Sequence, residues 1–346
     1  MFSFFCAKPA NKLTVNGGRH IATCEPEETL LSAALRCDIA ISHSCRVGSC
    51  ASCKCKLIKG EVKELTDSAY VLSQEELEQG YILACQSVPK SDVEIDVILG
   101  EVTAQLAVKE CSGVITAQQK LTHDITHLTI SLNESMNYTS GQYAELRIPA
   151  LSSAFRAYSF AAPSGGNQVE FFIREVSGGE LSPLVHSRNL LITPVEMHGP
   201  FGDFYLRESD APIVCVAGGS GLAPIKALLQ QALKEGVTRD VVFYFGARTQ
   251  QDLYCTDTIL ALAKQWQGRF TYIPVLSQEP DDSPWSGQRG LVTDALSQGL
   301  TGAEHAYLCG PPNMIDAAIE VLKTHCVQSA NIHFDKFISK ADLVAA

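Results

Sequence analysis

The segment SCRVGSCASCKCK, residues 44–56, constrains this chain more than any other stretch, because it brings four thiols into eleven consecutive positions. The thiols belong to Cys45, Cys50, Cys53 and Cys55. Thiols this close can form disulfides, bind zinc, bind an iron–sulfur cluster or stay unligated. The thirteen cysteines are odd in number, most of the others are scattered, and no secretion signal precedes them. This usage favours free thiols and metal ligation over disulfides.

The spacing of three of these cysteines, with one farther along the chain, matches an iron–sulfur pattern. Cys45-x4-Cys50-x2-Cys53, with Cys85 after a further thirty-one residues, is the plant-type arrangement of the four ligands of a [2Fe–2S] cluster. Structural zinc prefers two paired knuckles, and the sequence has no second Cys or His pair near Cys85. We therefore predict that these four thiols hold a [2Fe–2S] cluster, with zinc and unligated thiols as the alternatives. Cys55 follows on an apparent strand, where a buried cysteine is a small apolar filler.

Length and charge limit the remaining possibilities. At 346 residues the chain is too long for one ordinary core, so two or three domains are expected. The net charge of −11 argues against a nucleic-acid partner, since a phosphate-binding face needs clustered Lys and Arg. The sequence has no window of the roughly 18 uninterrupted apolar residues that cross a bilayer. We expect a cytoplasmic monomer that does not span a membrane.

Three segments with different hydrophobic patterns predict three domains. Residues 1–100 hold the cysteine cluster, and residues 101–108 read as a linker. Residues 109–207 are almost entirely short strands with turn residues between them, which is typical of an antiparallel barrel. From residue 208 to 346 strands alternate with helices, which indicates a parallel, doubly wound α/β sheet.

The expected elements follow from periodicity. In the first segment we expect a helix within 25–41 with a charged first turn, and strands on either side of Gly60 and over 92–99. In the second we expect one short helix over 180–187 and strands over 112–119, 125–132, 142–149, 156–162, 169–176 and 194–199. In the third we expect strands over 212–218, 240–247, 270–276 and 305–310 and helices over 222–236 and 313–326.

Residues 40–90 are similar to a plant-type ferredoxin, and SCRVGSCASCKCKL is close to the segment found in oxygenase reductases. The resemblance implies a β-grasp fold around the cluster. One departure is Ala51, where the family most often has glycine. Alanine is still small, so we expect the cluster to form with a perturbed potential.

The stretch RAYSFA, residues 156–161, resembles the R-x-Y-S motif of ferredoxin–NADP reductase-like flavoproteins. On that resemblance, Arg156 holds the FAD pyrophosphate through its guanidinium fork, and Tyr158 lies against the isoalloxazine. Ser159 would hydrogen-bond near the flavin N5, where hydride arrives. The alternative is ordinary: an arginine in solvent and a tyrosine in the core.

Two further stretches support a flavin site. In VSGGELSPL, Gly178 and Gly179 precede a helix with Ser182 in its first turn, so that backbone N–H groups can hold phosphate or Ser182 can simply cap the helix. HGPFGDF, residues 198–204, is another strand-end signature of the same family. The resemblance adds four more residues to the expected flavin site: Ile173, Arg174, Glu180 and Leu181.

The stretch VCVAGGSGLAPIKALL passes from a buried strand through a glycine turn into a helix. It opens the first strand–helix unit of the α/β segment, where a dinucleotide pyrophosphate meets the helix N-terminus. The residues expected to bind the nicotinamide coenzyme here are Gly219, Ser220, Gly221 and Pro224. YLCGPPNMIDAA resembles the family's C-G-P-P-x-M pattern, which adds Cys309, Gly310 and Pro311.

The resemblance gives three residues more specific roles. Cys309 would lie near the hydride-donating carbon and act with Ser159 in catalysis, although a buried strand-end thiol is the alternative. Phe337 would place an aromatic ring against the flavin. In FGARTQQDLY, Arg248 could meet a 2′-phosphate, but Asp252 would repel it, so we expect NADH rather than NADPH.

The order of ferredoxin, flavin barrel and nicotinamide domain resembles the single-chain reductase components of benzoate, naphthalene and phenol oxygenases. The resemblance implies that electrons pass from NADH to FAD, then to the [2Fe–2S] cluster and on to a partner oxygenase or hydroxylase. Two alternatives stay open. One is a reductase of deoxysugar biosynthesis with the same cofactors, and the other is a redox sensor or assembly subunit that does not turn over.

Overall fold

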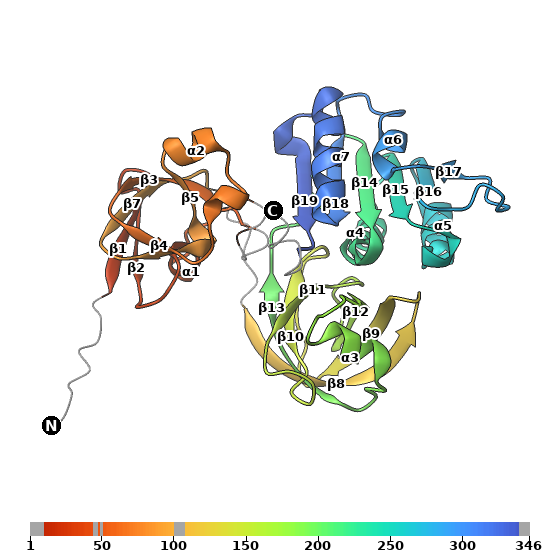
Figure 1. Ribbon diagram of the computed structural model, residues 1–346, viewed down its shortest axis with the longest axis horizontal. Coiled ribbons are helices and arrows are strands. Elements are labelled where there is room, and N and C mark those ends of the chain that lie inside the picture. The colour runs from red at the N-terminus through yellow and green to blue at the C-terminus, as the bar shows by residue number, and fades with distance from the viewer. Residues whose placement is uncertain (1–9, 44–47, 49–50, 100–107, 339–346) are drawn as a thin grey trace. The chain divides into compact units, whose positions relative to one another are not determined.

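The structure is a computed structural model that describes residues 10–43, 48, 51–99 and 108–338 (Figure 1). The chain divides into two compact units, Met1–Gln105 and Leu106–Ala345. Within the described residues, no helix combines the length and the apolar character needed to cross a membrane.

The first unit is a mixed five-stranded sheet crossed by one helix, which is the predicted β-grasp arrangement. The sheet order is β2-β1-β7-β3-β5, and only the central β1–β7 pair is parallel. Its strands are β1 Asn11–Val15, β2 His20–Cys24, β3 Lys54–Lys59, β5 Tyr81–Leu83 and β7 Val93–Asp96. A separate pair is formed by β4 Val62–Glu64 and β6 Ser87–Pro89. The helices are α1 Leu30–Arg36, α2 Gln74–Glu78, η1 Ser68–Tyr70 and η2 Ala84–Gln86.

Helix α1 forms where it was expected, but its start differs from the prediction. The acidic residues Glu27 and Glu28 lie before the helix, and the first turn contains none. Thr29 is the N-cap, and its side chain accepts a hydrogen bond from the Ser32 N–H. An N-cap oxygen satisfies a helix-end donor directly, so the helix begins after the acidic pair. The buried face of α1, which includes Leu30 and Leu31, fills the core of the unit.

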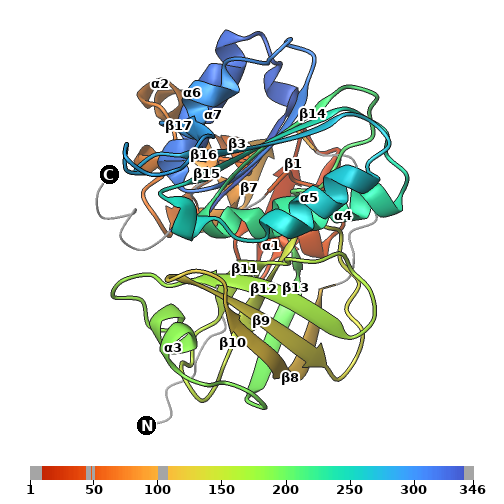
Figure 2. The same ribbon diagram turned by 90° about the vertical axis from the view of Figure 1, so that its right-hand side faces the viewer.

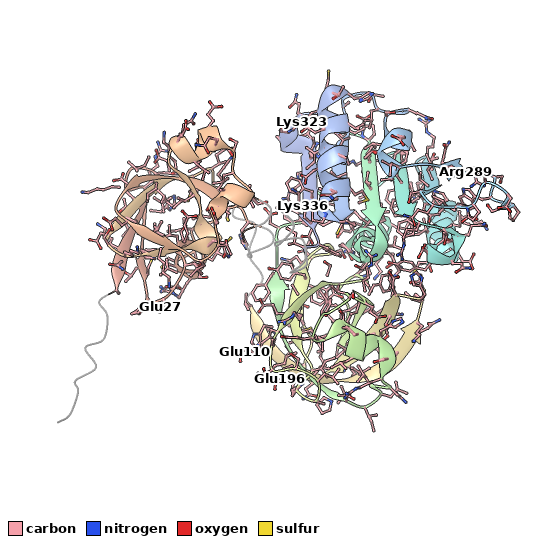
Figure 3. All side chains as sticks on the ribbon, viewed as in Figure 1. Glu27, Glu110, Glu196, Arg289, Lys323 and Lys336 are labelled. Carbon is pink, nitrogen blue, oxygen red and sulfur yellow. The ribbon has the colours of Figure 1, made fainter. Side chains whose placement is uncertain are left out.

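The second unit begins with the predicted antiparallel barrel. Its strand order is β11-β10-β13-β8-β9-β12, and a bridge between Phe160 and Phe171 joins the two ends of the sheet. The strands are β8 Lys109–Lys120, β9 Ile125–Leu132, β10 Tyr143–Arg147, β11 Arg156–Ser159, β12 Gln168–Arg174 and β13 Pro194–Phe201. Alternate residues of β9 are buried, whereas Glu110 and Glu196 carry their carboxylates on the outside (Figure 3). The predicted short helix is α3 Ser182–Ser187.

The rest of this unit is the predicted doubly wound α/β sheet. All strands are parallel in the order β17-β16-β15-β14-β18-β19. Its strands are β14 Ile213–Gly218, β15 Val241–Ala247, β16 Phe270–Leu276, β17 Gln288–Arg289, β18 His305–Gly310 and β19 Ile332–Lys336. The helices are α4 Leu222–Lys234, α5 Thr256–Gln265, α6 Val292–Leu296, α7 Pro312–Thr324, η3 Gly219–Gly221, η4 Gln250–Asp252 and η5 Ser329–Asn331.

Helices cover both faces of this sheet (Figure 2). Helices α4 and α5 pack with one set of β14 side chains, and α6 and α7 pack with the alternate set. Strand β14 is therefore buried along its whole length, as a central parallel strand must be. The chain reverses its strand order between β14 and β18, and in such sheets ligands bind at the carboxyl ends of the strands beside this reversal.

Candidate functional site

Two of the predicted cluster ligands are described, and the sheet brings them together. Cys53 directly precedes β3, and Cys85 lies in η2 just after β5. Strands β3 and β5 pair antiparallel, with Lys54 opposite Leu83. As a result, the Cys85 backbone N–H points at the Cys53 sulfur at 3.5 Å, and both side chains are buried. The other two predicted ligands, Cys45 and Cys50, lie outside the described residues.

The surroundings of these sulfurs suit an iron–sulfur cluster. The Gln86 side-chain amide donates to the Cys85 carbonyl oxygen at 3.0 Å and lies 3.8 Å from the Cys85 sulfur. Gly48 has a φ of +80°, and a Cβ there would stand 2.6 Å from Gln86 Cγ and 2.8 Å from Thr66 Oγ1. Iron–sulfur clusters use soft thiolate ligands with N–H donors near the sulfurs. A glycine lets the backbone approach closely where a side chain would collide.

Ala51 and Cys55 show why small residues occupy this loop. Ala51 has a φ of 55°, a left-handed conformation that glycine adopts without strain and alanine does not. Its carbonyl oxygen accepts a hydrogen bond from the Lys54 N–H, which closes the turn into β3. Cys55 is buried in the core of the unit, and burial raises the pKa of its thiol to about 12. That burial agrees with its predicted role as an apolar filler.

The predicted flavin residues lie along β11 and in the loop before α3. The Arg156 guanidinium forms an ion pair with the Glu180 carboxylate at 2.6 Å, which ties the two segments together. Tyr158 is half-buried, and Ser159 is buried beside Tyr143 of β10.

The loop itself differs in detail from the sequence reading. The Gly179 N–H donates to the Val176 carbonyl oxygen at 2.9 Å, so it is used within the loop. The Ser182 hydroxyl accepts from the Val176 N–H at 3.0 Å. It is not a helix cap, because the N-cap of α3 is Leu181, which makes no side-chain cap bond.

The carboxyl ends of β14 and β18 meet closely through glycines. A Cβ on Gly221 would stand 2.2 Å from the Cys309 carbonyl oxygen, and one on Gly310 would stand 2.9 Å from the Gly218 carbonyl oxygen. Glycine is therefore required by packing at these two positions, and only Gly219 and Ser220 of the turn before α4 are half-buried rather than buried. Ser220 is half-buried in the turn, whereas Pro224 is buried in the first turns of α4.

Cys309 and Phe337 lie near this reversal point. Cys309 is fully buried at the end of β18, and burial, reinforced by the Asp335 charge, raises its thiol pKa well above the usual value. It is a neutral thiol at physiological pH. Phe337 follows β19, and its N–H donates to the Gly310 carbonyl oxygen at 2.9 Å. The backbone therefore brings this aromatic residue to the same end of the sheet.

A cleft opens at these strand ends, between the sheet and the barrel. The sheet contributes the ends of β14, β15 and β16 together with Pro311 and Met314. The barrel contributes Asp124, Ile125 and Arg174. Arg174 Nη1 stands 3.5 Å from the position that a Cβ on Gly219 would take. A guanidinium next to a glycine turn at the start of a helix suits a pyrophosphate, because the guanidinium and the backbone N–H groups of the turn can both donate hydrogen bonds to anionic oxygens.

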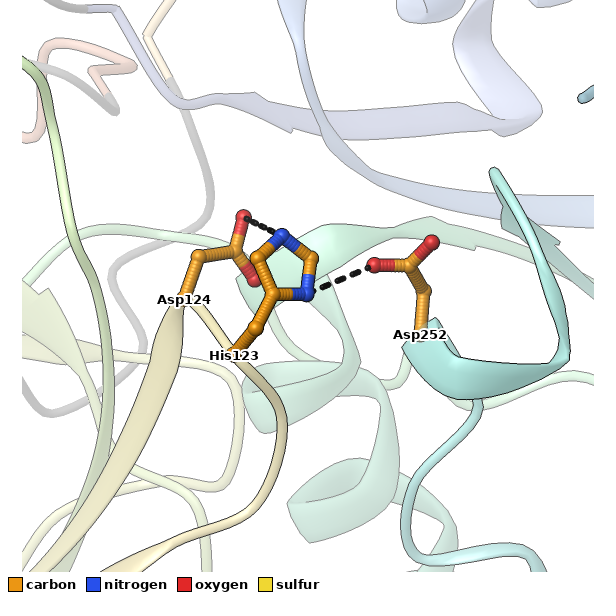
Figure 4. Close-up of side chains that lie close together, drawn as sticks. All are labelled: His123, Asp124 and Asp252. Carbon is orange, nitrogen blue, oxygen red and sulfur yellow. Dashed lines mark ion pairs between the residues drawn. The ribbon is translucent and has the colours of Figure 1, made fainter.

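One side-chain cluster at this cleft was not found from the sequence, and Figure 4 shows three of its members, His123, Asp124 and Asp252. Arg248 Nη2 lies 3.0 Å from Asp124 Oδ2, 3.0 Å from Asp252 Oδ1 and 3.1 Å from His123 Nε2. Asp124 and His123 lie in the turn between β8 and β9 of the barrel, whereas Arg248 and Asp252 follow β15. The sequence predicted that Arg248 and Asp252 share a site, but 124 positions separate Arg248 from Asp124, and no local pattern joins them.

Comparison with known protein families assigns each part of the chain. Residues 13–90 match the 2Fe–2S iron–sulfur cluster binding domain, residues 112–205 the oxidoreductase FAD-binding domain, and residues 215–320 the oxidoreductase NAD-binding domain. These matches confirm the predicted fold classes and the predicted cofactor types. The ranges matched lie within the three segments expected from the sequence.

The chain is also similar over its length to characterised proteins. It is 42% identical over 340 residues, 97% of this chain and 96% of the relative, to the electron transfer component of xylene/toluene monooxygenase from Pseudomonas putida. It is 34% identical to the phenol 2-monooxygenase reductase component of Pseudomonas sp. strain CF600, covering 95% of each chain.

Solved structures agree with these relatives. The Amycolatopsis cytochrome P450 reductase superposes with a TM-score of 0.81 at 32% identity, covering 94% of this chain and 98% of that one. The ferredoxin reductase of carbazole 1,9a-dioxygenase superposes with a TM-score of 0.75 at 26% identity, covering 95% of this chain and 99% of that one. The chain therefore belongs to the ferredoxin–NADP reductase-like family of iron–sulfur flavoprotein oxidoreductases, among the reductase components of oxygenase systems.

Proposed function

We propose that this chain takes electrons from NADH and delivers them singly to a monooxygenase component that acts on an aromatic hydrocarbon. The observation that carries the proposal is the match over 97% of the chain to the xylene/toluene monooxygenase electron transfer component. When bound, FAD accepts two electrons as hydride and returns them one at a time, and a [2Fe–2S] cluster is a one-electron outlet.

The chain's own residues have defined tasks in this proposal. Cys45, Cys50, Cys53 and Cys85 hold the cluster, and the Gln86 amide donates toward the Cys85 sulfur. Arg156, whose Nη2 contacts the Glu180 carboxylate, would exchange that contact for the flavin pyrophosphate, and the Ser159 hydroxyl would hydrogen-bond at the hydride-accepting edge. The domain limits that go with these roles are 1–100, 109–207 and 208–346, with 101–108 as the linker.

The coenzyme cleft supports NADH over NADPH. Arg174 and the glycine turn offer donors to the pyrophosphate, which both coenzymes share. Beyond β15, Arg248 already contacts the carboxylates of Asp124 and Asp252 at 3.0 Å each. A 2′-phosphate would meet two negative charges there. We expect kcat/KM for NADH to exceed that for NADPH by at least about tenfold, or ~1.4 kcal/mol in transition-state stabilisation.

Steady-state kinetics with two acceptors tests the proposal. The purified protein should oxidise NADH continuously with ferricyanide and with cytochrome c, and it should support product formation by an added aromatic monooxygenase. No turnover with either acceptor would favour the sensor or assembly subunit. Turnover without transfer to any oxygenase component would favour the deoxysugar reductase. Equal kcat/KM values for NADH and NADPH would contradict the coenzyme assignment.

Two broader assignments complete the proposal. We propose a cytoplasmic monomer; the cytoplasmic part is supported by the cysteine usage, because thirteen cysteines, most of them scattered singly, are typical of a reducing compartment. The acidic net charge supports an acceptor that is a protein rather than a nucleic acid.

A further inference from the structure

Asp124 connects the barrel to both arginines of the coenzyme cleft. Its Oδ2 accepts hydrogen bonds from Arg174 Nε at 3.1 Å and from Arg248 Nη2 at 3.0 Å. The Thr122 hydroxyl donates to its Oδ1 at 2.9 Å, which fixes the carboxylate within its own turn. The Asp124 side chain is 15% exposed, so water screens these contacts only in part.

The neighbouring groups could suggest a metal site, but a cation already occupies it. One ligand atom each from His123, Asp124 and Asp252 lie within 4.8 Å of one another (Figure 4). The Arg248 guanidinium nitrogen bonds all three of these residues at 3.0–3.1 Å. A metal ion would have to displace it. The cluster is therefore an arginine site with two carboxylates and an imidazole around it.

The positive charge of Arg248 is neutralised by the carboxylates around it. Burial raises the pKa of Asp124, but the Thr122 hydrogen bond and the charges of Arg174 and Arg248 outweigh burial and hold the pKa below its usual range. The carboxylate is thus ionised at neutral pH. Asp252 is oriented toward Arg248 by hydrogen bonds from the Thr249 N–H and hydroxyl. One guanidinium therefore contacts two carboxylates, and the site carries no spare positive charge.

The position of Arg248 makes this compensation relevant to coenzyme choice. Arg248 lies just after β15, the strand next to β14 and its glycine turn, and it lines the same cleft. In doubly wound sheets the residue in this region meets the ribose 2′ position, where an arginine accommodates a 2′-phosphate. Arg248 would be such a residue if its nitrogen were available. Asp124, which belongs to the other domain, holds that nitrogen.

We propose that Asp124 of the flavin barrel is a specificity-determining residue that withholds Arg248 from a 2′-phosphate and, through Arg174, positions the donor over the glycine turn. The inference rests on the proposed use of a nicotinamide coenzyme in this cleft. It assigns coenzyme choice to a residue outside the NAD-binding domain. Discrimination is accordingly reduced when the Asp124 charge is removed, even with the NAD-binding domain unchanged and Asp252 still in contact with Arg248.

The test compares two probes that differ only in the 2′-phosphate, adenosine 5′-monophosphate and adenosine 2′,5′-bisphosphate. Their dissociation constants are measured by titration calorimetry on the full-length protein and on Asp124→Asn. We expect the substitution to shift the ratio of the two constants toward the bisphosphate by at least about tenfold, because a hydrogen bond to a charged group contributes at least that much. The ratio of kcat/KM for NADPH and NADH should move in the same direction.

Matched variants separate this role from a structural one. Asp240→Asn removes a carboxylate that pairs with Arg269 at the opposite end of β15, and it should leave the ratio unchanged. Asp124→Glu keeps the charge and should stay near the wild-type ratio. In an Arg248→Ala background, Asp124→Asn should no longer change the ratio. An unchanged ratio in Asp124→Asn, or a shift that persists without Arg248, would overturn the inference. If the wild-type protein oxidised neither coenzyme, the proposed function itself would fail.

Discussion

In the first unit, Cys53 and Cys85 meet because β3 pairs with β5, and the contact is made by backbone and sulfur. In the second unit, Asp124 and Arg248 meet across the cleft between the barrel and the sheet, and the contact is made by charged side chains. The cluster loop depends on buried groups and special backbone angles at Gly48 and Ala51. The coenzyme cleft depends on partly exposed ion pairs.

This difference predicts different responses to substitution. Buried ligands and strained backbone have no substitutes nearby, so a change in the cluster loop should remove the site or alter its stability. Partly exposed charges are compensated by neighbours and screened by water, so a change in the cleft should shift selectivity and leave the fold intact.

The largest effect should follow from Cys85→Ser. Since the two units have separate cores, the variant should lose the visible [2Fe–2S] absorption while FAD stays bound in the second unit. NADH oxidation with ferricyanide, which can accept electrons without the cluster, should continue. The rate of cytochrome c reduction should fall to a small fraction of the wild-type rate. The measurements are absorption spectra, FAD content after desalting and the two acceptor rates.

Cys55→Ser is the matched control, because Cys55 is equally buried in the same unit and is not a predicted ligand. It should keep the cluster absorption. Loss of FAD from Cys85→Ser would show that the cluster stabilises the whole chain, and loss of absorption from Cys55→Ser would reassign the ligands.

Local patterns predicted the three domain types and many of their strands and helices, and several residues predicted to bind the coenzyme line one cleft at the strand ends. Strands β9, β16 and β18 begin and end where the sequence predicted, and the glycine turn lies between β14 and α4, in the first strand–helix unit, as predicted. Two omissions have different causes. The β1–β2 hairpin was missed although Asn16-Gly17 between its strands is a turn signal. The Asp124–Arg248 contact carries no such signal, because it exists only after two domains pack.

Acidic pH should lower the stability of the second unit, because a buried histidine near two arginines resists protonation in the folded state. His333 of β19 stacks on Tyr307, and its Nε2 is buried with no hydrogen-bond partner among the described residues. Burial, followed by the charges of Arg207, His305 and Arg239, lowers the pKa of His333 to about 4. The folded state therefore resists protonation, whereas an unfolded histidine titrates near 6.5.

The sign follows from proton linkage. Between about pH 6.5 and 4 the unfolded state binds more protons at this residue, so stability is full above the upper value and falls as the pH decreases. The loss should reach at most about 3.5 kcal/mol, at ~1.4 kcal/mol per pKa unit. Urea unfolding of the second unit, followed by flavin fluorescence at several pH values, measures it. His333→Phe should flatten this dependence, and an unchanged slope in that variant would assign the acid sensitivity elsewhere.

The smallest effect tests whether the cluster loop is strained where the structure shows a left-handed residue. Ala51 has a φ of 55°, where alanine costs about 1 kcal/mol more than glycine. Ala51→Gly should therefore stabilise the first unit, by about 0.5 kcal/mol once the greater freedom of glycine in the unfolded chain is subtracted. Urea unfolding followed by the visible circular dichroism of the cluster reports on this unit. Ala33→Gly in α1 is the control of opposite sign, since a glycine inside a helix lowers stability by about 1 kcal/mol and the buried Ala33 also loses a packed methyl group. Destabilisation by both substitutions would show that the loop holds Ala51 without strain. The contrast between the cluster loop and the coenzyme cleft would then rest on burial alone.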